Sequence, residues 1–135
     1  MLPDELSETV PEHLGPDHLA QLPSGKRLGI YKHYLKDEYA RIRSVHEQGG
    51  GGCEVAALRS EVIDTLLRSL FLTATAQDSD SSSLSLMANG GYGRGLLNPA
   101  SDIDLLFLLP KASHLKTRIQ LCSLIISVFH LTTQV

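Results

Sequence analysis

The stretch that decides the fold begins with Leu86-Met87-Ala88-Asn89-Gly90-Gly91-Tyr92-Gly93-Arg94-Gly95 and continues through Asn98-Pro99-Ala100-Ser101 to Asp102-Ile103-Asp104-Leu105-Leu106-Phe107-Leu108-Leu109. It predicts a short apolar strand, a glycine turn, one or two turns of helix and a second apolar strand that opens with two acids. Because side chains alternate along a strand, Asp102 and Asp104 are expected on one face. Two carboxylates beside a glycine turn, whose backbone N–H groups can meet phosphate oxygens, are the parts needed to hold a metal–triphosphate.

The glycine pattern alone has several readings. Gly90-Gly91-x-Gly93-x-Gly95 is close to dinucleotide-binding and kinase glycine patterns. A dinucleotide site of the Rossmann type needs an acid about 20 residues on, at the end of a second strand. Here the acids follow ten intervening residues, 92–101, and they begin a strand. A P-loop is also excluded, because no Lys-Ser/Thr pair follows the glycines.

The two acids strengthen the hypothesis of a metal site. An Asp-x-Asp pair on its own is common where a strand starts and faces solvent. Asp104, however, lies inside an otherwise apolar run, and burying an unpaired carboxylate costs several kcal/mol. A metal ion is the simplest partner, so we expect Asp102 and Asp104 to bind one.

The composition of the 135 residues, 42% apolar and 20% charged, is typical of one soluble globular domain. The net charge of −3 gives no reason to expect a nucleic-acid partner or an anionic membrane surface. The two cysteines have no Cys-x-x-Cys spacing, and the acidic N-terminus lacks the order of a signal peptide. The longest apolar run is too short to cross a bilayer. We therefore expect a cytoplasmic protein.

The chain divides into four segments. Residues 1–24 carry four of the six prolines and predict a poorly ordered leader. Residues 25–76 predict an N-terminal helical segment of two helices, separated by the four glycines 49–52. A polar loop follows at 77–83. Residues 84–135 predict the strand, glycine turn and strand, then a third helix that begins near Ser113.

Gly90-Gly91 followed by Asp102-Ile103-Asp104-Leu105 resembles the signature of the nucleotidyltransferase superfamily, whose fold is shared with DNA polymerase beta. The longer string from Gly90 to Leu106 is closer still to the bacterial protein-PII uridylyltransferase/uridylyl-removing family. Upstream, Arg59-Ser60 and Ile63-Asp64 are similar to the helix before the catalytic strand in that family. The resemblance covers residues 25–135. It implies an α+β nucleotidyltransferase fold, with a small mixed sheet, two strands of it present here, flanked by helices.

The resemblance also implies roles for individual residues. Asp102 and Asp104 would be catalytic and would bind two Mg²⁺ ions, while Gly90 and Gly91 would let the backbone approach the phosphates. The substrate would be UTP, the acceptor a tyrosine of the PII signal protein, and glutamine the effector of the full-length enzyme.

Two further residues of the stretch each have two readings. Arg94 fits a phosphate contact or an ion pair that steadies the acids. Ser101 fits a residue that orients Asp102 or a plain turn residue.

The chain also departs from the family pattern. Leu96 and Asn98 replace an acid and an aromatic residue, which we expect to alter local packing or substrate contacts rather than metal binding. A third carboxylate on a later strand, a phosphohydrolase domain and glutamine-sensing domains normally follow, so we expect an N-terminal fragment. Two alternatives stay open: a nucleotidyltransferase-like regulator with another acceptor, and a non-catalytic remnant that binds nucleotide or a partner protein.

Overall fold

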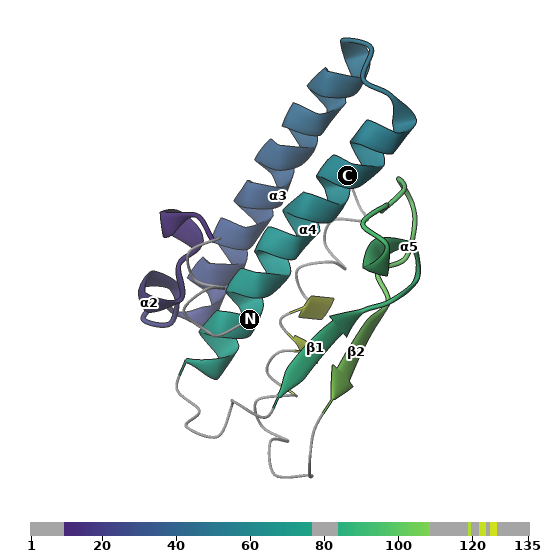
Figure 1. Cartoon of the computed structure of the whole chain (residues 1–135). Helices are drawn as coiled ribbons and strands as arrows, with labels where there is room; N and C mark the ends of the chain where they lie inside the picture. The colour runs from purple at the N-terminus through teal and green to yellow at the C-terminus, as the bar shows by residue number, and fades with distance from the viewer. Residues whose placement is uncertain (1–9, 77–83, 109–118, 120–121, 124, 127–135) are drawn as a thin grey trace.

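The computed structural model describes residues 10–76, 84–108, 119, 122–123 and 125–126. Its elements, in chain order, are η1 (Glu12–Leu14), α2 (Pro16–Leu19), α3 (Ser24–Glu47), α4 (Gly52–Thr75), β1 (Ser85–Ala88), α5 (Gly90–Gly93) and β2 (Leu105–Leu108). Helices α3 and α4 form a long hairpin, with α2 on one side of the pair and β1, β2 and α5 on the other (Figure 1). The expected α+β class is confirmed.

The two long helices begin and end where the glycines predict. Gly49 has a φ of 98°, a left-handed conformation that glycine adopts without steric cost, and it follows the last turn of α3. The extended Gly51 then caps the start of α4. The apolar stripe of α4 supplies much of the core, including Ile63, Leu66 and Leu70, which are fully buried. None of the helices that the structure describes is long and apolar enough to cross a membrane.

The segment before α3 differs from the expected loose leader. Leu14 and Leu19 are both 0% exposed and belong to the main hydrophobic core. The prolines do not prevent helix formation here, because Pro11 and Pro16 stand at the starts of short helices, where a missing N–H costs nothing. The expectation of a poorly ordered leader is therefore wrong for residues 10–24. Residues 1–9 lie outside the described part of the chain.

The two strands pair antiparallel, with Leu86 opposite Phe107 and Met87 opposite Leu106. One side of the pair packs on the core through Leu86, Leu105 and Phe107, whereas Met87 and Leu106 are exposed on the other side. This alternation is that of a sheet buried on one face. Among the described residues the sheet is this antiparallel pair, so the expected mixed sheet stays a prediction.

Two expected segments fall largely outside the described residues. The polar loop 77–83 lies wholly outside them, as does Ser113, the expected start of the third helix. The positions described within that expected helix are helical: Ile119, Cys122, Ser123, Ile125 and Ile126.

Candidate functional site

The glycine turn begins where β1 ends, and its glycines themselves form the helical turn α5. Asn89 N–H donates to the Asp104 carbonyl at 2.9 Å, which ties the end of β1 to the residue before β2. Gly90 has a φ of 64°, and a Cβ at Gly93 would lie 2.6 Å from the Ala88 carbonyl oxygen. Glycine is therefore required at 90 by the backbone conformation and at 93 by the close approach of the main chain.

The turn brings the Asp104 carboxylate against the backbone of Gly90. A Cβ at Gly90 would lie 2.6 Å from Asp104 Oδ2, so the bare glycine makes room for the carboxylate. Exposure alternates along the approach to β2, since Asp102 and Asp104 are exposed and Ile103 between them is half-buried. Both acids precede β2, which begins at Leu105, instead of opening the strand. The structure thus brings Asp104 to Gly90 at an exposed edge, as the spacing predicts, and Asp102 precedes Asp104 by two residues.

Asp104 is exposed, so the expectation of a buried charge in need of a partner is wrong. It lies just outside the paired residues of β2, where the chain leaves the sheet. In the described part of the chain, neither Asp102 nor Asp104 forms a side-chain hydrogen bond or ion pair. Their carboxylate oxygens are therefore available to a ligand without the breaking of an internal contact.

The chemistry of this pair fits magnesium. Mg²⁺ prefers oxygen ligands and is commonly held by one or two carboxylates together with substrate phosphates and water. Among the residues that the structure describes, no group of three or more His, Cys, Asp or Glu side chains could form a metal cage. Asp102 and Asp104 thus suit an ion shared with a bound phosphate.

The structure also places the other predicted site residues. Arg94 is exposed and closes the turn through its N–H, which donates to the Gly91 carbonyl at 3.2 Å. Its guanidinium forms no ion pair with a described residue, so the steadying ion pair is not seen and the phosphate contact stays a prediction. Ser101 N–H donates to the Asn98 carbonyl at 3.1 Å, and Ala100 within that turn has a φ of 61°. These contacts fit the reading of Ser101 as a turn residue.

The contacts that fasten the turn to α4 are not predicted from the sequence, although Ser60 and Asp64 lie in the stretch that resembles the family. Tyr92 is 5% exposed, and its hydroxyl donates to Asp64 Oδ1 at 2.6 Å. Burial first, and then this bond, raises the pKa of Tyr92 well above its usual range, so the phenol keeps its proton. Further along, Leu97 N–H donates to Ser60 Oγ at 2.9 Å and to the Ala56 carbonyl at 3.1 Å.

The sequence marks these residues individually, although it does not predict that they meet. Tyr92 is the aromatic residue among the glycines, and Ser60 and Asp64 are four positions apart on one helix face.

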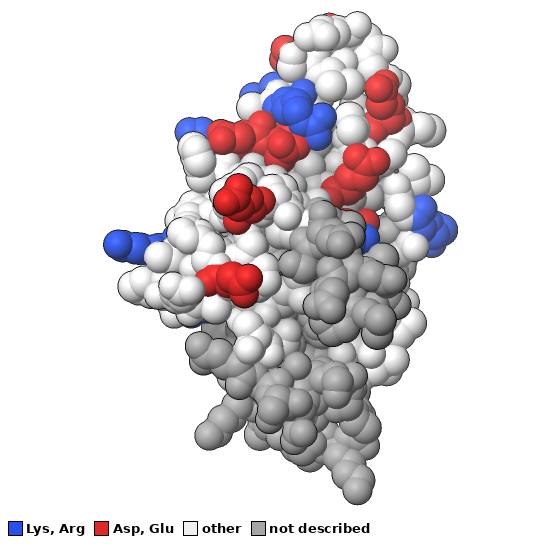
Figure 2. Space-filling model, turned by 60° about the vertical axis from the view of Figure 1, so that its left-hand side comes forward, with Lys and Arg blue, Asp and Glu red and all other residues white. Residues whose placement is uncertain are grey.

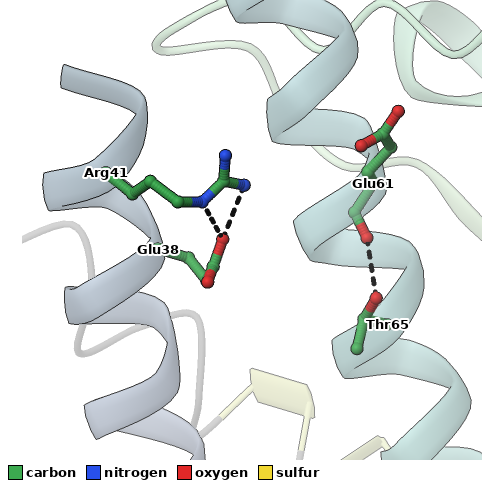
Figure 3. A network of polar contacts seen from close by, with 4 residues as sticks. All are labelled: Glu38, Arg41, Glu61 and Thr65. Carbon is green, nitrogen blue, oxygen red and sulfur yellow. Dashed lines mark hydrogen bonds and ion pairs between the residues drawn. The ribbon is translucent and has the colours of Figure 1, made fainter. Parts of the chain in front are cut away.

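An open groove of about 910 Å³ lies on the side of the helix pair away from the glycine turn. Its walls include four polar residues, two from α3 and two from α4 (Figure 3). On α3, Glu38 Oε2 accepts a hydrogen bond from Arg41 Nε at 2.8 Å. On α4, Thr65 Oγ1 donates to the Glu61 carbonyl at 3.0 Å. Acidic and basic side chains are interspersed over this helical face (Figure 2). None of the predicted site residues lines the groove, so it is separate from the candidate site.

Comparison with known proteins finds a family match over the region that contains the candidate site. Residues 71–131 match the family described as nucleotidyltransferase domain. The matched residues include the glycine turn and both aspartates. The chain is 40% identical over 115 residues to the bifunctional uridylyltransferase/uridylyl-removing enzyme of Phenylobacterium zucineum (81% of this chain, 12% of the relative). It is 40% identical over 90 residues to the enzyme of that name from Rhodospirillum rubrum (62% and 10%), and 34% identical over 115 residues to that of Azospirillum brasilense (81% and 12%).

The family resemblance is thereby confirmed, and the chain spans 10–12% of the length of these relatives. No solved structure matches the chain.

Proposed function

Residues 71–131 carry a nucleotidyltransferase domain sequence, and from this premise we propose that the chain holds part of a site that transfers UMP from UTP to a tyrosine of the PII signal protein. One observation carries the proposal. The Asp104 carboxylate packs directly on the Gly90 backbone, so the turn that would accept phosphate and an acid that would bind metal lie together at one exposed edge. The relatives are uridylyltransferases, which suggests the uridylyl group, and the resemblance to their family suggests the acceptor.

The residues of this chain would act by binding and orientation. Gly90 and Gly91 present main chain without side chains, so the triphosphate can approach the backbone closely. Arg94, exposed at the end of the turn, would contact a phosphate oxygen through its guanidinium. The rigid turn beneath them, closed by the bonds from Arg94 and Leu96 N–H to the Gly91 carbonyl, would keep these groups in place.

Asp102 and Asp104 would hold magnesium, which suits their exposed oxygen ligands. When bound, Mg²⁺ would neutralise phosphate charge and lower the pKa of the attacking hydroxyl. In the transfer, the tyrosine oxygen forms a bond to the α-phosphorus of UTP. The bond from that phosphorus to the β-phosphate oxygen breaks, pyrophosphate leaves, and the tyrosine proton passes to solvent.

The proposal also covers the compartment, the effector and the partners of the protein. The longer protein to which such a domain belongs would work in the cytoplasm and would respond to glutamine. Neither a nucleic acid nor a membrane is expected as a partner.

Transfer of label from UTP to PII tests the donor and the acceptor together. Because the chain holds only two of the three expected carboxylates, transfer would be assayed with a longer protein that contains it, incubated with Mg²⁺, PII and UTP labelled at the α-phosphate. The labelled tyrosine would be identified by mass spectrometry. The proposal expects label on one PII tyrosine with wild type and none with Asp104→Asn. The exposed Asp17→Asn in α2 removes the same charge on the far side of the helix pair and serves as control.

Other results would separate the alternatives. Label on a different acceptor protein would favour a regulator of another target and contradict the assignment of PII. Tight Mg-UTP binding without transfer to any acceptor would favour the non-catalytic nucleotide-binding alternative for this chain. Absence of nucleotide binding would contradict the proposed site altogether.

A further inference from the structure

The glycine turn is held against α4 by two side chains that belong to neither the turn nor the acid pair. We infer that Asp64, together with Ser60, positions the turn: Asp64 fixes Tyr92, and Ser60 fixes Leu97. The inference rests on the proposed nucleotide-binding function and assigns it a part that lies before residue 71, outside the matched domain.

The turn needs an external anchor because of its own composition. Glycine occupies positions 90, 91, 93 and 95, and glycine loses more conformational freedom on ordering than any other residue. The internal bonds of the turn, such as Gly93 N–H to the Asn89 carbonyl at 2.8 Å, close it locally. They do not fix it relative to the rest of the protein.

Two side-chain contacts to α4, together with the backbone bond from Leu97 N–H to the Ala56 carbonyl, supply that fixation at separate points. Tyr92 sits at the middle of α5, buried to 5% exposure, and its hydroxyl reaches the Asp64 carboxylate at 2.6 Å. Leu97, which is 1% exposed, is held through its N–H by Ser60 Oγ at 2.9 Å. Ser60 is itself fixed, because its hydroxyl donates to the Ala56 carbonyl at 3.1 Å.

The geometry links these anchors to the metal-binding carboxylate. Tyr92 is two residues from Gly90, whose α-carbon leaves room for the Asp104 carboxylate. A rotation of α5 away from α4 would therefore move Gly90 relative to Asp104. Asp64 would act on the nucleotide only through Tyr92, so it is a positioning residue and not a catalytic one.

Three variants test the role of Asp64 through its bond to Tyr92. Tyr92→Phe removes only the hydroxyl, and Asp64→Ala removes the acceptor. Asp64→Asn keeps an oxygen that can accept the same bond. Tyr31→Phe is the matched control, because it removes another buried tyrosine hydroxyl that donates to Thr73, away from the turn. Each full-length variant would be assayed for Mg-UTP affinity by calorimetry and for amide hydrogen exchange in residues 90–97.

The inference predicts that Tyr92→Phe and Asp64→Ala each weaken Mg-UTP binding about tenfold, since a hydrogen bond to a charged group is worth about that factor. The double variant should be no worse than either single one, because both break one contact. Asp64→Asn should bind more tightly than Asp64→Ala, because it keeps an acceptor, and Tyr31→Phe should bind as wild type does.

Hydrogen exchange gives a readout that does not require nucleotide. Faster exchange in residues 90–97 for Tyr92→Phe and Asp64→Ala, but not for Tyr31→Phe, would support the inference even if wild type failed to bind Mg-UTP. That failure would overturn only the proposed function. Unchanged exchange and unchanged affinity in both variants would overturn the positioning role. Equal loss of affinity in Tyr31→Phe would overturn it as well, because the effect would then follow general stability.

Discussion

Gly90→Ala is the substitution with the most specific expected effect, because two separate costs meet at this position. The φ of 64° is a left-handed conformation, which costs a non-glycine residue about 1–2 kcal/mol. The new Cβ would also lie 2.6 Å from Asp104 Oδ2, well inside ordinary carbon–oxygen contact, so the carboxylate must turn away. We expect the free energy of unfolding to fall by about 1–2 kcal/mol, mainly from the backbone cost. Mg-UTP affinity should fall by about tenfold or more as Asp104 leaves its position.

Gly95→Ala is the control that separates these two costs. Gly95 has a φ of 72°, but nothing lies within 4 Å of the position of its Cβ. This variant should lose the same stability in a urea unfolding experiment and yet keep wild-type affinity for Mg-UTP in calorimetry. If Gly90→Ala and Gly95→Ala bind Mg-UTP equally well, the reasoning that links Gly90 to Asp104 is refuted.

Three further predictions concern stability. Ser69→Ala should lower the free energy of unfolding by about 1–3 kcal/mol in urea titrations, because the buried Leu14 carbonyl loses the Ser69 hydroxyl that donates to it at 2.6 Å. Amide hydrogen exchange near η1 should become faster, and an unchanged rate would argue against the contact. Ala100→Gly should raise stability by about 0.5–1 kcal/mol in the same assay, since it relieves a φ of 61°; a loss of stability would contradict this. Burial raises the pKa of four tyrosines above the usual 10.0, so above about pH 10 the folded chain keeps protons that the unfolded chain loses. The free energy of unfolding should therefore fall as the pH rises above about 10. Urea unfolding from about pH 8 to 11 measures this, and the absence of a decline would show that the phenols are solvated. These tyrosines are Tyr31, Tyr34, Tyr39 and Tyr92.

The parts of the fold with strong local signals could be predicted from the sequence. The two long helices follow from apolar periodicity interrupted by four glycines, and β1 and β2 follow from short apolar runs on either side of the turn. The spacing predicts that the glycine turn and the acids lie close together, and the structure shows how: antiparallel pairing returns the chain to the point where it turned.

Features that depend on tertiary contacts could not be predicted in this way. The burial of Leu14 and Leu19 arises because α3 and α4 offer an apolar surface to a short segment whose own sequence looks irregular. The exposure of Asp104 depends on where pairing of the strands stops, which an apolar run does not define. The Tyr92–Asp64 bond joins residues that are far apart in the chain, and neither has a local pattern that selects the other.

The central claim is that Asp102 and Asp104 hold a metal-bound nucleotide at the glycine turn. The most direct measurement is calorimetric titration of the chain with UTP, with and without Mg²⁺, in wild type, Asp102→Asn and Asp104→Asn, with Asp17→Asn as the charge-matched control. We predict Mg²⁺-dependent binding in wild type and Asp17→Asn, and binding weakened by about tenfold or more in each of the other two variants. Wild-type affinity for Mg-UTP in both Asp102→Asn and Asp104→Asn would contradict the account.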